Sequence, residues 1–131
     1  METDKLLNTE YWIIDILPKR VPMDSPGQYF AVEKHFLSEE IESIKKKHIN
    51  LILKLNCYRE ISIEGESDPE PAKTAEIMKA GYVYIMTGDS MILSEPDDTH
   101  MTLFNPDDEL LELVKLIASG EGLFVWRGDE Q

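Results

Sequence analysis

Three histidines and one cysteine are the side chains of this sequence that most readily carry acid–base or nucleophilic chemistry. His100 has the richest surroundings, since it follows Asp97 and Asp98 at a turn that leads into a predicted strand. A carboxylate beside an imidazole can orient a general base or help to bind a divalent cation. His100, with Asp97 or Asp98 as ligand or orienting group, is therefore the candidate centre of a small hydrolase or metal-dependent enzyme.

A polar turn explains the same residues without any catalysis. Asp97 and Asp98 are adjacent, and adjacent side chains on an extended chain point apart, which disfavours a shared metal site. Either aspartate can instead accept a hydrogen bond from the backbone of the turn. We favour this structural interpretation and assign no metal site and no cofactor. His100 and Asp98 stay as catalytic candidates.

Cys57 is the one candidate thiol nucleophile in the chain. It lies at a predicted helix-to-strand junction and not at a helix N-terminus, where a thiolate would be stabilised. We therefore expect a small buried apolar residue at this position. His48 falls on the apolar stripe of a predicted helix, which favours a core histidine over a catalytic one. A single cysteine also excludes an intramolecular disulfide and a multi-cysteine metal site.

Charge is distributed unevenly along the sequence. The chain carries 13 basic and 26 acidic side chains, a net charge of −13, and residues 61–131 contribute 4 basic and 16 acidic ones, a net −12. Such a field repels nucleic-acid phosphates and anionic membrane surfaces and attracts a basic protein. The one basic cluster, Lys45–Lys47, is expected on the solvated face of a helix. The sequence thus argues against binding to nucleic acid or to membranes.

The elements that must position these residues follow from hydrophobic spacing and from capping residues. In the first half we expect a strand over 11–17, a helix capped by Ser25 that runs to Phe36, a helix over 38–55 capped by Ser38, and a strand over 57–64. The segment 29–37 also alternates like a strand. In the second half we expect a helix over 72–80, strands over 82–86, 90–93 and 99–104, a helix from Pro106 to Gly120 capped by Asn105, and a strand over 123–126.

These elements define one α+β domain over residues 1–131, with a polar tail from about residue 127. The length fits a single domain of roughly 100–150 residues. Short turns between the strands predict a mainly antiparallel sheet of five or six strands. The two main amphipathic helices are expected to pack on one face of that sheet.

The charge and the missing catalytic motif favour a non-enzymatic interaction module that binds a basic protein, of the inhibitor, immunity-protein or antitoxin kind. We expect a cytoplasmic protein, because no apolar run approaches the roughly 20 residues of a membrane span and residues 1–4 lack the features of a signal peptide. A homo-oligomer formed through a sheet edge or an aromatic face is an alternative.

The aromatic pair Tyr82 and Tyr84 is expected in the core of the sheet, or at an interface if it is exposed. The predicted partner-binding residues lie in two loops: Glu64, Glu66, Asp68, Glu70, Glu95, Asp97 and Asp98.

Overall fold

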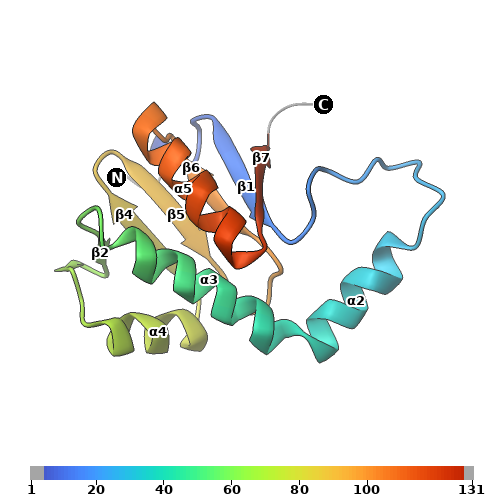
Figure 1. The fold of residues 1–131 in the computed structure, drawn as a ribbon, viewed down its shortest axis with the longest axis horizontal. Coiled ribbons are helices and arrows are strands. Elements are labelled where there is room, and N and C mark those ends of the chain that lie inside the picture. Colours follow the sequence, from blue (N-terminus) through green and yellow to red (C-terminus); the bar gives the residue numbers. More distant parts are fainter. Residues whose placement is uncertain (1–4, 129–131) are drawn as a thin grey trace.

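The computed structural model describes residues 5–128, which form helices packed on an antiparallel sheet (Figure 1). The elements in chain order are β1 (Tyr11–Asp15), α2 (Tyr29–Glu39), α3 (Ile41–Leu55), β2 (Ser62–Ile63), β3 (Glu66–Ser67), α4 (Pro71–Ala80), β4 (Val83–Thr87), β5 (Ser90–Ser94), β6 (Met101–Phe104), α5 (Asp108–Glu121) and β7 (Phe124–Arg127). The α+β class expected from the sequence is confirmed.

The sheet has seven strands in the order β3-β2-β4-β5-β6-β1-β7, and each neighbouring pair is antiparallel. The expected number of five or six was too low because β3 lies in a segment predicted as a loop. Glu64 and Gly65 both have positive φ angles, and two such residues in succession form a tight hairpin turn. The turn folds Glu66–Ser67 back onto β2 as the additional strand.

The main core lies between the sheet and three helices, α3, α4 and α5 (Figure 1). Leu51, Ile52 and Leu55 of α3 are fully buried and belong to the same cluster as Ile85 of β4 and Leu103 of β6. A smaller apolar cluster forms separately, with Leu6, Met91 and Phe104 at its centre. Most of the buried apolar residues therefore join the helices to the sheet.

Both of the helix starts predicted in the first half of the chain were wrong. Helix α2 begins at Tyr29, four residues after Ser25, and Gln28 occupies its N-cap position. Ser25 instead uses its Oγ to accept a hydrogen bond from the N–H of Gly27. Ser38 lies inside α2, because no Gly or Pro stops that helix and the chain passes into α3 through Glu40 alone.

The strand predicted over 57–64 is much shorter in the structure. After α3 the chain continues in turns, with the N–H groups of Tyr58 and Arg59 bonded to the Leu55 carbonyl. Asp68 then accepts hydrogen bonds from the Ile61 N–H and from Asn56 Nδ2. These contacts hold the segment off the sheet until residue 62, so only Ser62–Ile63 pairs with β4.

Helix α5 begins at Asp108 and not at Pro106, because Asp107 and not Asn105 is its N-cap. Asp107 Oδ1 accepts a hydrogen bond from the Leu110 N–H at 2.8 Å. Asn105 has a positive φ of 55° and donates its side-chain amide to the Asp89 carbonyl. The helix ends at Gly122, whose left-handed conformation (φ 79°) suits a glycine.

Replacing this cap tests the assignment. Asp107→Ala is expected to lower the free energy of unfolding by about 1 kcal/mol, since it removes the side-chain acceptor of the first helical turn. Asp108→Ala should cost less, because Asp108 contributes only its charge near the positive end of the helix. Urea denaturation of both variants measures the difference. Equal losses would contradict Asp107 as the cap.

Only part of the predicted polar tail falls within the structure. Arg127 belongs to β7, where it pairs with Trp12, and residues 129–131 lie outside the described residues. Among residues 5–128, no helix has the length and apolar character needed to cross a membrane.

Candidate functional site

Asp98 and His100 form a hydrogen-bonded pair where the β5–β6 loop enters β6. His100 Nδ1 lies 2.9 Å from Asp98 Oδ1, and the two side chains are 35% and 31% exposed. The hydrogen bond that His100 donates to Asp98 raises the pKa of His100. Burial opposes ionisation of Asp98, but the bond from His100 outweighs it and lowers the pKa of that carboxyl. Asp97 is exposed and is not part of the pair.

A small cavity of about 60 Å³ borders His100 and Thr99, and β1 and α2 supply further polar groups. Asp15, at the end of β1, is buried, and this burial raises its pKa although its Oδ1 accepts from the Ile16 N–H at 2.7 Å. Tyr29 of α2 donates its hydroxyl to Glu33 at 3.0 Å. Burial, followed by the bond and charge of Glu33, raises the pKa of Tyr29 to about 12. The cavity has room for water and not for a larger substrate.

Helix α3 contributes a second, deeper pair beside the same loop. His48 is fully buried, which confirms the core position expected for it. Lys45 is only 6% exposed, so the expectation of a solvated face was wrong for this member of the cluster. Its Nζ lies 3.0 Å from His48 Nδ1 and donates to the Glu95 carbonyl. Burial and the charge of Lys45 lower the pKa of His48 to about 3, and burial lowers the pKa of Lys45 to about 8.

The Asp98–His100 pair has the chemistry of an oriented proton acceptor. A carboxylate bonded to one ring nitrogen fixes the tautomer and stabilises the protonated ring. Within residues 5–128, no three His, Cys, Asp or Glu side chains are grouped so that they could hold a metal ion. The polar groups around His100 can therefore bind or transfer a proton.

Asp98→Asn should lower the pKa of His100 towards the ordinary value of about 6.5, because it removes the charge that stabilises the imidazolium. The pair's contribution to stability is present below the pKa of His100 in the unfolded chain and is lost as the pH rises through its higher folded pKa. Histidine NMR titration measures the shift. Asp97→Asn is the matched control and should change the His100 titration less. Equal shifts would contradict the assigned partner.

Cys57 is exposed, so the expectation of a buried residue was wrong. It follows the C-terminal end of α3, where the chain turns back, and its Sγ lies 3.7 Å from the Leu53 carbonyl. His100 is near the other half of the same helix, beside Lys45 and His48. The structure therefore places His100 with Asp98 and not with the thiol.

The acidic residues predicted to bind a partner lie at two separate places along the sheet. One group is in or next to the β2–β3 hairpin at one edge of the sheet and contains Glu64, Glu66, Asp68 and Glu70. The other group is in the loop that connects the central strands β5 and β6 and contains Glu95, Asp97 and Asp98. Three of the seven side chains have hydrogen-bond or ion-pair partners among residues 5–128. Asp68 holds the segment after α3, Glu66 pairs with Lys73, and Asp98 pairs with His100.

The exposed side of α2 is the feature that the sequence interpretation missed. All eleven residues of this helix are exposed or half-buried, and the Phe30 side chain is 80% exposed. Met23 before the helix and Leu37, two turns after Phe30, are also exposed. We call Phe30 and Leu37 the α2 surface. Tyr29, Val32 and Phe36 border the cavity beside His100, and helical spacing places Phe30 and Leu37 on another face of α2.

No family model matches the chain, and neither a curated protein nor a solved structure matches it.

Proposed function

We propose that this protein is a non-enzymatic interaction module that binds a basic protein through the α2 surface and the adjoining acidic β5–β6 loop. The observation that carries the proposal is the exposure of Phe30 on a helix with no buried residue. Large aromatic side chains contribute much of the energy of protein interfaces, and an aromatic residue so exposed is a natural anchor.

The acidic loop lies close enough to α2 to belong to the same surface. The rings of Phe30 and Tyr29 are 5.3 Å apart between centroids, and the charges of Asp98 and Asp15 help to raise the pKa of the Tyr29 hydroxyl, after its burial and Glu33. The cavity beside His100 is bordered by residues of both α2 and the loop. An aromatic anchor next to carboxylates favours a partner that offers an apolar pocket edged by lysine or arginine.

The net charge of −13 supports the same kind of partner. Opposite charge accelerates the encounter of two proteins and disfavours acidic competitors. An inhibitor, immunity protein or antitoxin in the cytoplasm would use such a field to capture a basic toxin or nuclease rapidly. The Glu64–Glu70 segment contributes to this long-range attraction, whereas the α2 surface supplies the contact.

Charge reversal in the acidic loop tests the proposal. The double variant Glu95→Lys, Asp97→Lys should capture less of a basic protein from native lysate than the unmodified chain does. Raising the salt concentration should weaken capture by the unmodified chain, because salt screens exposed charges. Glu112→Lys on the exposed side of α5 is the control and should retain the partner. Failure to recover a basic protein even at low salt would contradict the proposal, and light scattering would then test self-association.

A hydrolase centred on His100 is the second candidate, and the 2.9 Å contact with Asp98 favours it. A paired imidazole and carboxylate can act as a general base. This function would require that His100→Gln abolishes hydrolysis in a screen of chromogenic esters and phosphoesters, with the unmodified chain active. The cavity of about 60 Å³ beside His100 makes it the weaker of the two.

A further inference from the structure

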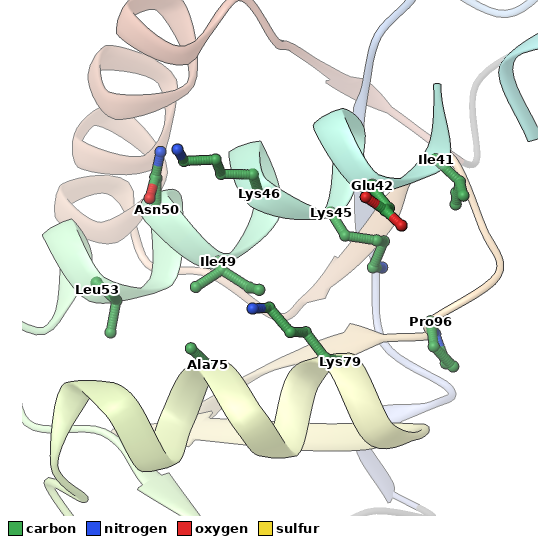
Figure 2. Close-up of a pocket in the computed structure, with 10 residues that line it drawn as sticks. All are labelled: Ile41, Glu42, Lys45, Lys46, Ile49, Asn50, Leu53, Ala75, Lys79 and Pro96. Atoms are coloured by element: carbon green, nitrogen blue, oxygen red, sulfur yellow. The ribbon is translucent and has the colours of Figure 1, made fainter. Parts of the chain in front are cut away.

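A second surface, on elements other than α2, has the opposite charge character. A groove of about 790 Å³ runs between α3 and α4 and meets Pro96 of the β5–β6 loop at one end (Figure 2). Its floor is apolar, with Ile49 and Leu53 of α3 opposite Ala75 of α4. This volume lies in the range of ordinary small-molecule sites.

Lysines dominate the charged lining of this groove. Lys45 and Lys46 come from α3, Lys79 comes from α4, and Glu42 is the acidic side chain of the lining. Figure 2 shows Lys79 reaching from α4 towards Ile49. Among residues 5–128, none of the three lysines has a carboxylate within 4.0 Å. The groove is thus locally basic in a chain of net charge −13.

Lys45 is the most unusual of the three because its ammonium group is buried with no carboxylate of residues 5–128 within 4.0 Å. Its Nζ donates to the Glu95 carbonyl and to Nδ1 of neutral His48, and an ammonium group has three hydrogens to donate. A buried charge is costly unless it is paired and fully hydrogen-bonded. An anion that reached Lys45 from the groove would supply both a negative charge in direct contact and the third acceptor.

We propose that the groove between α3 and α4 binds a small organic carboxylate with an apolar body. The carboxylate contacts Lys45 and Lys79, and the apolar body lies along Ile49 and Leu53. A monoanion fits better than a polyanion such as phosphate, because Glu95, Asp97 and Asp98 also act on Lys45 and would repel additional negative charge. This proposal does not depend on Phe30 or Leu37 of the α2 surface, although the groove adjoins the acidic β5–β6 loop at Pro96.

Methyl and amide NMR titration with decanoate, kept below its critical micelle concentration, tests the site. Decanoate should shift the methyl signals of Ile49, Leu53 and Ala75. Lys45→Met and Lys79→Met should each weaken binding about tenfold or more, the usual effect of removing one charged hydrogen bond. Lys19→Met, on the exposed loop before α2, is the control and should bind decanoate normally. Decanol, which has the same chain without the charge, should bind more weakly than decanoate.

Several outcomes would overturn the proposal. These are the absence of shifts with decanoate, shifts located outside the groove, an affinity for decanoate in both lysine variants equal to that of the unmodified chain, or binding of decanol as tight as that of decanoate. Displacement of decanoate by inorganic phosphate at the same concentration would overturn the carboxylate class. If amide signals show that Lys45→Met has lost its fold, Lys79→Met and decanol still decide, since Lys79 is exposed and decanol needs no substitution.

Discussion

Lowering the pH from 7 to 5 is expected to remove about 2 kcal/mol of folding free energy through His48 alone. His48 is fully buried, and its pKa in the folded protein is lowered to about 3, by burial and by the charge of Lys45. In the unfolded chain the same ring takes up a proton near pH 6.5. Protons therefore bind the unfolded state preferentially below that pH, and stability falls until the pH reaches the folded pKa.

His48→Gln isolates this effect, since a glutamine oxygen can still accept from Lys45 but does not titrate. The difference in unfolding free energy between the unmodified chain and His48→Gln should change by about 2 kcal/mol between pH 7 and 5 in urea denaturation. The His100 pair acts in the opposite direction and is common to both proteins, so it cancels. His35→Gln, at an exposed position on α2, should keep the full pH dependence. A pH-independent difference for His48→Gln would contradict a neutral buried ring.

Phe30→Ser should weaken binding of the captured basic partner by about 2 kcal/mol, roughly 30-fold in Kd, as expected for an aromatic anchor. The free energy of unfolding should change little, because the Phe30 ring is 80% exposed and loses few intramolecular contacts. Calorimetric titration with the partner, together with urea denaturation, separates the two effects.

Tyr58→Ser is the matched control for this measurement. Tyr58 is also an exposed aromatic residue, but it follows the C-terminal end of α3, away from the acidic β5–β6 loop. Its substitution should leave affinity unchanged. Equal losses for Tyr58 and Phe30 would show that general surface hydrophobicity, and not the α2 surface, holds the partner.

Regular spacing in the sequence predicted the long elements of the fold well. The apolar stripe of α3 and the short turns between β4, β5 and β6 place those elements correctly to within a few residues. The errors lie where side chains distant in sequence decide the outcome. Asp68 holds the chain after α3 and shortens β2, and the positive φ angles of Glu64 and Gly65 create β3. Neither effect can be predicted from the regular spacing of apolar residues in the sequence.

The site was less predictable than the fold, because it depends on contacts across the chain. Asp98 and His100 belong to the same predicted turn, which indicated that they could pair. The sequence did not indicate that Asp15 and Tyr29 border the same cavity as His100. The sequence predicted that Lys45, like Lys46 and Lys47, is exposed to solvent. Lys45 is buried instead, because its position on α3 faces the β5–β6 loop, where its Nζ donates to the Glu95 carbonyl. Exposure of Phe30 could have been inferred from helical spacing, since Tyr29, Val32 and Phe36 occupy the other face.

Photo-crosslinking in the native host tests the proposed interaction module most directly. A photoreactive phenylalanine analogue at position 30 should give a discrete crosslinked species that contains a basic protein. The same analogue at position 58 should not give that species. Identical crosslinking patterns from positions 30 and 58, or no crosslinked protein from position 30, would contradict the assignment of the α2 surface as the binding site.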